Sequence, residues 1–111
     1  MKEVRIYLLH IRDAIEQIFS YTQAGKEAFF AEPKTRDAVV RNLEIIGEAV
    51  KNLPEDFKAK HSDIPWKRMA GMRDKMIHEY FGVNFKLVWE SVDRDLPVLK
   101  QKIETILRET K

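Results

Sequence analysis

Apolar residues recur along nearly the whole chain at intervals of three and four, and strict alternation of apolar and polar residues is almost absent. This spacing places side chains on one face of an α-helix, whereas a half-buried strand would alternate. We therefore expect an all-α fold. Long helical segments with this spacing cover residues 4–18, 35–53, 65–81 and 84–106. We expect an antiparallel bundle of four to five helices, with short accessory turns at residues 26–31 and 55–60.

A few residues indicate where these helices begin, bend or cross. Thr35 and Asn84 can each cap the helix that follows. Pro97 lies inside the last segment, where its ring should kink or break the helix near Leu96. Gly47 and Gly71 lie inside helical stretches, where glycine costs about 1 kcal/mol relative to alanine. We expect close approach of another backbone to compensate, so the two helices that contain these glycines should cross near them.

The composition restricts the class of protein and of partner. A formal net charge of +2 over 111 residues is too small for general nucleic-acid affinity, so any attraction for phosphate must be local. The chain has no cysteine, which excludes disulfides, thiolate catalysis and cysteine-ligated zinc. Charges recur near the N-terminus, and no apolar run approaches the ~18 residues that span a bilayer. We expect one cytoplasmic domain, residues 1–111, with no membrane segment.

The third helical segment contains an R-x4-H-x-Y pattern formed by Arg73, His78 and Tyr80. Arginine is a permanent cation that binds phosphate through two N–H groups, and histidine titrates near neutral pH. A phosphate clamp beside a proton-transfer group is what RNA cleavage needs. Asp74 could accept the ring N–H of His78 and fix its tautomer. On a regular helix Tyr80 lies within roughly 20° of Arg73 but His78 lies about 140° away. A distorted helix, bent side chains or a partner subunit would have to complete the site.

Two polar residues of the second helical segment are further candidates. Asn42 falls on the apolar stripe, where a buried amide needs a partner, either within the core or on a substrate. Glu48 lies off the centre of the stripe and could face the helix that contains the R-x4-H-x-Y pattern. His10 and His61 are expected to be solvated or locally paired, and no histidine spacing indicates a metal site. We expect neither a metal nor another cofactor.

Beyond the isolated motif, four passages of the sequence resemble HepT-like proteins of the HEPN superfamily. The passages are D-A-I-E-Q-I (13–18), A-V-V-R-N-L-E-I-I-G-E-A-V (38–50), I-P-W-K-R-M-A-G-M-R-D-K-M-I-H-E-Y-F (64–81) and V-W-E-S-V-D-R-D-L-P-V-L (88–99). They follow the order found in the family and cover nearly the full length. The resemblance implies an all-helical domain that forms a homodimer, often with its two R-x4-H motifs facing a shared cleft. Each site could then draw on both subunits.

The resemblance also implies an activity and its partners. The expected activity is that of a metal-independent endoribonuclease, the toxin of a two-gene toxin–antitoxin system, with tRNA or mRNA as the natural substrates. Arg73 and His78 would be catalytic, and Asp74, Asn42 and Glu48 would support them. The antitoxin would be a minimal nucleotidyltransferase that neutralises the toxin by adenylylating Tyr80, and the two proteins could form a hetero-oligomer larger than the dimer.

Asp74 departs from the family pattern, which usually has Asn directly after the motif arginine. A carboxylate there adds negative charge beside the scissile phosphate, so it could weaken RNA binding, or it could instead orient His78. Two alternatives therefore stay open. In the first, a non-catalytic helical dimer uses Arg73 and His78 to bind a nucleotide or the nucleotidyltransferase. In the second, the dimer is purely structural and Arg73 pairs with a carboxylate.

Overall fold

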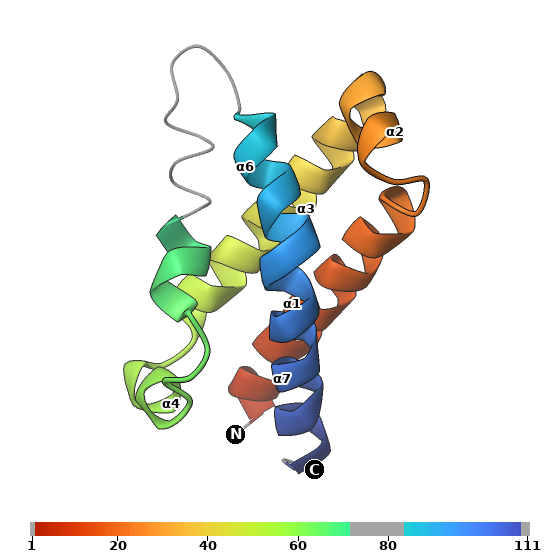
Figure 1. Cartoon of the computed structure of the whole chain (residues 1–111). Coiled ribbons are helices and arrows are strands. Elements are labelled where there is room, and N and C mark those ends of the chain that lie inside the picture. Colours follow the sequence, from red (N-terminus) through yellow and green to blue (C-terminus); the bar gives the residue numbers. More distant parts are fainter. Residues whose placement is uncertain (1, 72–83, 110–111) are drawn as a thin grey trace.

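The structure is a computed structural model that describes residues 2–71 and 84–109. Helices joined by short turns form this part of the chain (Figure 1), and no strand occurs within it. The elements are α1 (Lys2–Tyr21), α2 (Lys26–Ala31), α3 (Pro33–Asn52), α4 (Glu55–Lys60), α6 (Phe85–Glu90), the π-helical turn η1 (Ser91–Asp95) and α7 (Leu96–Glu109). Residues 66–71 are also helical and are called here the upstream helix, because they precede the R-x4-H-x-Y motif. The predicted all-α fold is confirmed.

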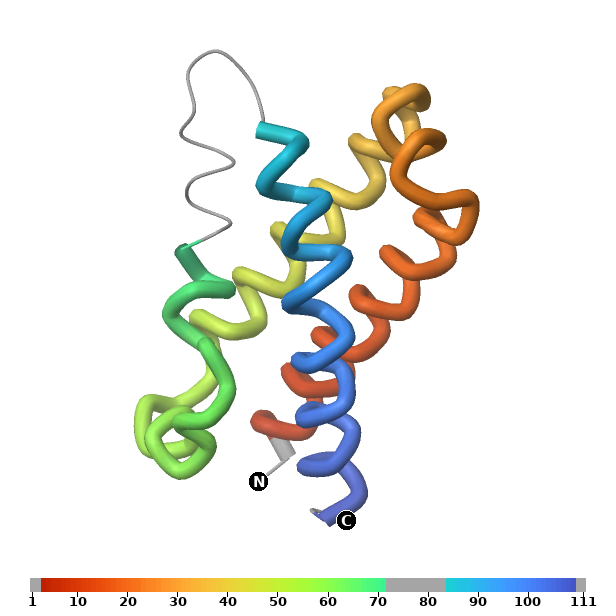
Figure 2. Tube along the Cα trace, viewed as in Figure 1, coloured from red at the N-terminus to blue at the C-terminus, as the bar shows by residue number. Residues whose placement is uncertain are grey.

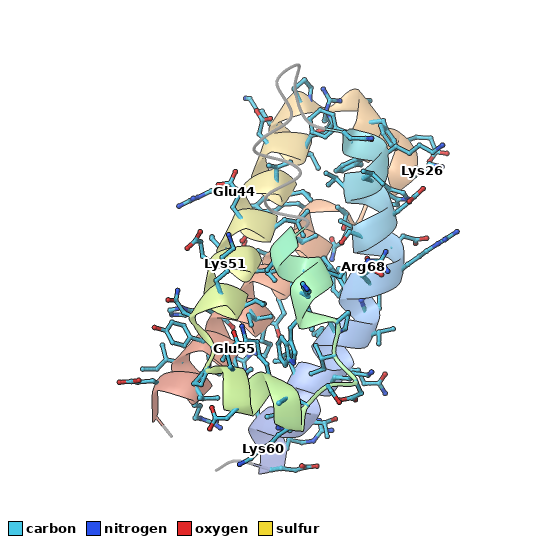
Figure 3. All side chains as sticks on the ribbon, turned by 90° about the vertical axis from the view of Figure 1, so that its left-hand side faces the viewer. Lys26, Glu44, Lys51, Glu55, Lys60 and Arg68 are labelled. Atoms are coloured by element: carbon cyan, nitrogen blue, oxygen red, sulfur yellow. The ribbon has the colours of Figure 1, made fainter. Side chains whose placement is uncertain are left out.

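The long helices pack together as a bundle. Helix α1 packs against both α3 and α7 and runs antiparallel to each of them in Figure 1 and Figure 2. The beginning of α1 and the end of α7 lie at the same end of the molecule (Figure 2). The upstream helix lies on one side of the bundle, at the left in Figure 1, and in the rotated view of Figure 3 it lies in front, with α3 to one side and the continuous α6–α7 helix to the other. The predicted antiparallel bundle is therefore confirmed.

The core consists of the apolar stripes that the spacing predicts. Each long helix contributes one buried stripe to a single core, since burying an Ile or Leu side chain stabilises the fold by about 1.5–3 kcal/mol. The central residues of these stripes are Leu8, Ile11, Ile15 and Ile18 of α1, Val39, Leu43, Ile46 and Val50 of α3, and Leu96, Leu99 and Ile103 of α7, all of them buried. Phe29 of α2 closes the core at one end and is fully buried.

The helix starts agree only in part with the sequence predictions. Helix α3 begins at Pro33 with Glu32 at the cap, so the predicted cap at Thr35 is wrong. Thr35 lies inside the first turn, and its hydroxyl is 3.4 Å from a carboxylate oxygen of Glu32. Proline suits the first helical position because its φ is already helical and it lacks the N–H that would have no partner there. The cap predicted at Asn84 is confirmed, because its side-chain oxygen accepts the N–H of Leu87 at 3.2 Å.

Two predictions about helix irregularity also need correction. A Cβ added at Gly71 would meet no atom of the described chain within 4 Å, so the close backbone approach expected there is wrong. Near Pro97 the helix is not broken. The N–H of Leu96 instead donates to the carbonyl of Ser91, five residues back, which is the π-helical bond of η1. The wider turn directly precedes the proline, so the predicted disturbance takes the form of a π-helical turn.

Ser91 provides a test of the packing around η1. The residue is 1% exposed, and its hydroxyl has no hydrogen-bond partner within the described chain. An unsatisfied buried polar group costs about 1–3 kcal/mol. We expect Ser91→Ala to raise the free energy of unfolding by about 1 kcal/mol in a urea titration. The control is Thr105→Ala, which removes a satisfied hydroxyl that donates to the carbonyl of Gln101 at 3.0 Å and reports the gain in helix propensity alone; the gain in Ser91→Ala should be larger than that. A clear loss of stability in Ser91→Ala would contradict this account of η1.

Candidate functional site

The four motif-region residues predicted to act in the site, Arg73, Asp74, His78 and Tyr80, lie outside the described residues. The description stops at Gly71, two residues before Arg73, and resumes at Asn84, four residues after Tyr80. The geometry of the site is therefore given by the two elements that flank the motif in the sequence and by the residues of α3 that face them.

The upstream helix is anchored at its beginning by a buried tryptophan. The indole N–H of Trp66 donates to the carbonyl of His61 at 3.0 Å, and its ring packs against Phe57 of α4 with centroids 6.0 Å apart. The first helical bond runs from the N–H of Met69 to the carbonyl of Pro65. Met69 is buried in the core. The chain thus approaches the motif from a fixed direction.

An ion pair also ties the upstream helix to η1. A guanidinium nitrogen of Arg68 lies 3.2 Å from a carboxylate oxygen of Asp95, but the contact lacks the alignment of a hydrogen bond. The Asp95 side chain is 16% exposed and that of Arg68 is 65% exposed. Because one partner is mostly solvated, the pair contributes at most about 1 kcal/mol. It links the upstream helix to η1, and Figure 3 labels Arg68 on the upstream helix.

The element after the motif is fixed by aromatic packing. Phe85 is the first residue of α6, directly after the Asn84 cap, and its ring meets that of Phe29 edge-on with centroids 6.3 Å apart. The guanidinium carbon of Arg36, on α3, lies 4.8 Å from the centre of the Phe85 ring. Four rings gather here, those of Phe29, Phe30, Phe85 and Trp89, and are called the aromatic corner. The chain therefore leaves the motif into a firmly packed element.

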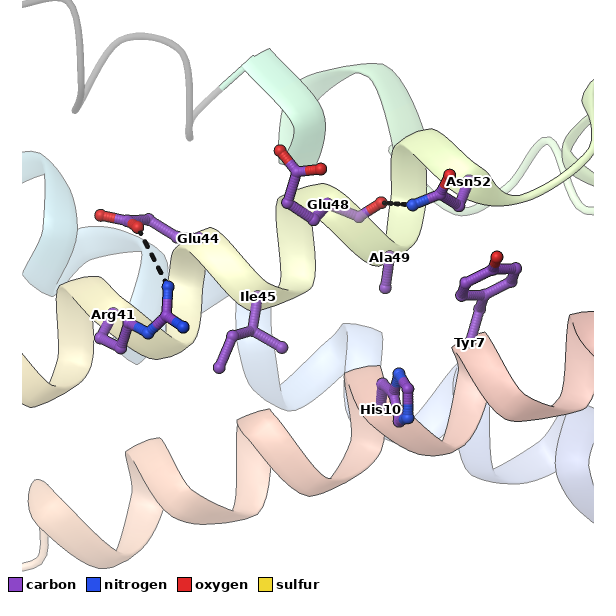
Figure 4. Close-up of a pocket in the computed structure, with 8 residues that line it drawn as sticks. All are labelled: Tyr7, His10, Arg41, Glu44, Ile45, Glu48, Ala49 and Asn52. Atoms are coloured by element: carbon purple, nitrogen blue, oxygen red, sulfur yellow. Dashed lines mark hydrogen bonds and ion pairs between the residues drawn. The ribbon is translucent and has the colours of Figure 1, made fainter.

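The two candidate residues of α3 occupy different surroundings. Asn42 is half-buried, and its amide N–H donates to the carbonyl of Ala38 at 2.9 Å, one turn back on the same helix. This bond favours the interpretation of Asn42 as a polar residue satisfied within the fold. Glu48 is exposed, and Figure 4 shows its carboxylate directed away from α1 and toward the upstream helix. Of these two residues, Glu48 lies on the side of α3 that faces the upstream helix, and the upstream helix leads into the motif.

A cavity of about 260 Å³ lies between α1 and α3, on a different side of α3 from the Glu48 carboxylate (Figure 4). Its lining residues are Tyr7, His10, Arg41, Glu44, Ile45, Glu48, Ala49 and Asn52. Sequence reasoning missed this cavity. The available signal was a second stripe on α3, where Arg41, Glu44, Ile45 and Glu48 recur at three- and four-residue steps. Within the described ranges, no three His, Asp or Glu side chains gather closely enough to hold a metal ion.

Comparison with known proteins identifies the family. The family model described as "Ribonuclease HepT-like" matches residues 11–106, a range that includes the motif, the upstream helix and α6. The chain belongs to the HepT-like ribonuclease family. The resemblance stated from the sequence is thus confirmed, and so is the ribonuclease class at the level of the family. None of the helices that the structure describes is long and apolar enough to cross a membrane.

Curated HepT-like relatives match most or all of the chain. "Putative RNase TTE0752" of Caldanaerobacter subterraneus subsp. tengcongensis is 48% identical over 112 residues, which is 100% of both proteins. "Probable ribonuclease HepT" of Thermococcus cleftensis is 52% identical over 90% of this chain and 92% of its own length. "Gamma-glutamylcyclotransferase and putative RNase MJ0434" of Methanocaldococcus jannaschii is 50% identical over 97% of this chain, which spans 49% of that relative. No solved structure matches the chain.

The cap at Asn84 gives a test of how the HepT-like chain leaves the motif. Asn84→Ala removes the bond to the N–H of Leu87 and should lower the free energy of unfolding by about 1 kcal/mol. Asn84→Asp keeps an oxygen acceptor and should preserve stability. The matched control is Asn52→Ala, since the Asn52 amide donates to the Glu48 carbonyl near the exposed end of α3. Equal stability of the two Asn84 variants in urea unfolding would show that the cap does not fix α6.

Proposed function

We propose that this chain is a metal-independent endoribonuclease that uses the R-x4-H-x-Y motif. The main support is the family match over residues 11–106, which includes Arg73, His78 and Tyr80. The anchored upstream helix and aromatic corner add support, because a catalytic segment needs fixed ends to place its side chains. In this proposal residues 1–111 form a single domain that acts on tRNA or mRNA in the cytoplasm.

The proposed reaction uses the RNA's own 2′-hydroxyl as the nucleophile. The 2′-oxygen forms a bond to the adjacent phosphorus, and the bond from phosphorus to the 5′-oxygen of the next nucleotide breaks. His78 removes the proton of the 2′-hydroxyl or protonates the departing 5′-oxygen, a role worth about 10²–10⁴-fold in rate. Arg73 stabilises the negative charge that develops on the phosphorane oxygens. Tyr80 positions the phosphate through its hydroxyl.

A homodimer completes this proposal. Arg73 and His78 lie about 140° apart on a regular helix, so a site shared between two subunits could combine the Arg73 of one chain with the His78 of the other. The Glu48 carboxylate, on the side of α3 that faces the upstream helix, could pair with a basic group of the motif region.

We further propose that the protein is the toxin of a two-gene system whose antitoxin is a minimal nucleotidyltransferase. Adenylylation of Tyr80 would place a bulky anion in the path of the RNA and block it both sterically and by charge repulsion. The two proteins would associate for this transfer and could form a hetero-oligomer.

The decisive experiment compares cleavage of total RNA in EDTA by the wild type with cleavage by Arg73→Ala and His78→Ala. We expect each variant to lose at least about 10²-fold in rate while keeping the melting temperature of the wild type. His10→Ala, on the exposed side of α1, is the matched histidine control and should keep full activity. A DNA oligonucleotide should remain intact because it lacks the 2′-hydroxyl, and cleavage of DNA would rule out this mechanism.

A second experiment tests the modification of Tyr80. Incubation with the proposed minimal nucleotidyltransferase and with ATP should add adenylyl groups to the intact mass and abolish RNA cleavage. Tyr80→Phe should stay unmodified, whereas the control Tyr21→Phe, which changes an exposed tyrosine at the end of α1, should be modified like the wild type. Modification of Tyr80→Phe to the wild-type extent would disprove the assignment.

Asp74 favours one other candidate function, a non-catalytic dimer that binds a nucleotide or the nucleotidyltransferase. Its carboxylate takes the place of the usual amide and would repel the scissile phosphate. Asp74→Asn separates the two functions. If the wild type is inactive in EDTA and Asp74→Asn cleaves RNA, the chain is a binding protein derived from a ribonuclease. If both cleave, the endoribonuclease proposal stands.

A further inference from the structure

We propose that Arg36 and Phe30 form an RNA-binding site next to the motif. In this site Arg36 binds a backbone phosphate, and Phe30 stacks against a base of a single-stranded segment. The inference rests on the proposed ribonuclease function and deepens it, because it names groups that would hold the substrate outside the R-x4-H-x-Y motif.

Two contacts fix the orientation of Arg36. One terminal nitrogen of its guanidinium donates to the carbonyl of Phe30 in the last turn of α2. The guanidinium carbon lies over the ring of Phe85, 4.8 Å from the ring centre. A guanidinium oriented in advance loses little conformational entropy on binding a ligand. The fixed orientation of its guanidinium therefore suits Arg36 to binding an anion.

The charge of Arg36 is also left without a carboxylate. Arg12 pairs with Asp13, Arg41 with Glu44 and Arg68 with Asp95, but Arg36 forms no ion pair within the described chain.

Its Nε–H is shielded from solvent and has no hydrogen-bond partner among the described residues. Buried donors are normally satisfied, so this Nε–H is unusual. Because the atom is covered, a phosphate would bind at the terminal nitrogens of the guanidinium, one of which also donates to the Phe30 carbonyl. A phosphate oxygen is the acceptor that arginine binds best, through two parallel bonds. Among the described residues, the Arg36 guanidinium therefore has no anionic partner.

Phe30 supplies an aromatic surface beside this cation. Its side chain is 38% exposed, although it belongs to a group of otherwise packed rings. Its ring meets that of Phe29 edge-on at 5.1 Å between centroids, and Phe29 in turn contacts Trp89 at 5.2 Å. An exposed ring with rigid support, next to an arginine, is the combination with which proteins bind single-stranded RNA: the ring stacks on a base and the arginine binds the backbone.

The position of the site along the chain connects it with catalysis. Phe85, on which Arg36 stacks, follows Tyr80 by five residues in the sequence. Five residues of chain span at most about 18 Å, so a strand bound at Tyr80 would need only a few further nucleotides to reach Arg36. The site therefore fits nucleotides next to the scissile bond, and it would favour substrates that are unpaired there.

The test uses the His78→Ala variant, so that the RNA stays intact, and a fluorescein-labelled single-stranded RNA. Affinity is measured by fluorescence anisotropy over a range of salt concentrations. Adding Arg36→Gln should weaken binding at least five-fold and reduce the slope of log affinity against log salt by about 0.7, the loss of one phosphate contact on a single strand. Adding Phe30→Ala should also weaken binding at least five-fold but leave the slope unchanged. Arg41→Gln, on the same helix but paired with Glu44, is the control and should stay within two-fold.

The outcomes separate this inference from the function on which it rests. If His78→Ala binds RNA and adding Arg36→Gln changes neither affinity nor salt slope, the Arg36 site is disproved and the ribonuclease proposal survives. If the wild type neither cuts nor binds RNA, the proposed function itself fails. Should Arg36→Gln lower the melting temperature, Arg36→Lys decides: retention of the wild-type salt slope supports phosphate binding. A slope as low as that of Arg36→Gln overturns it.

Discussion

The packing of α1, α3 and α7 around one apolar centre is the constraint on which the other elements depend. Ile11, Ile46 and Ile103, one from each helix, have no exposed surface. The short elements add to this centre and do not form cores of their own: α2 contributes Phe29, and the upstream helix contributes Met69. A six-residue helix such as α2 is too short to be stable alone, so α2 holds its place because the long helices provide a surface for it, and α6 is held because it continues through η1 into α7.

The upstream helix and the start of α6, which flank the motif, are fixed by different kinds of contact. The upstream helix depends on a buried indole, with its bond to the His61 carbonyl, and on a largely solvated ion pair to Asp95. The start of α6 depends on ring packing and on the guanidinium of Arg36. Salt screens exposed charge pairs but hardly affects ring contacts. The start of α6 should therefore keep its position over a wider range of ionic strength than the Arg68–Asp95 contact of the upstream helix.

Much of the fold follows from the sequence, because a stripe of apolar residues at three- and four-residue steps indicates an α-helix with one buried face. That signal was enough for α1, α3 and α7, and the Asn84 cap followed from local chemistry. Helix α3 starts earlier than the predicted Thr35 cap because the ring geometry of Pro33 suits the first turn. The expectation at Gly71 failed because a glycine inside a helix does not by itself require a neighbouring backbone, and no described atom lies within 4 Å of where its Cβ would be.

The candidate site was predictable only where its residues are neighbours in the sequence. The R-x4-H-x-Y pattern and the family resemblance can both be read along the chain. Arg36 and Phe85 are 49 residues apart, and no periodicity links them, so their contact appears only in three dimensions. The same holds for Arg68 and Asp95.

The π-helical turn η1 sets the rotational phase of the whole last helix. Val88, Val92 and Leu96 follow one another in two steps of four residues, and all three are buried. On a regular α-helix two such steps would drift about 80° around the axis. The wider turn takes up this drift, so that the apolar face of α6 continues that of α7. One residue more or fewer between Ser91 and Asp95 would rotate Phe85 away from Phe29, which means that the length of a distant turn determines where the chain leaves the motif.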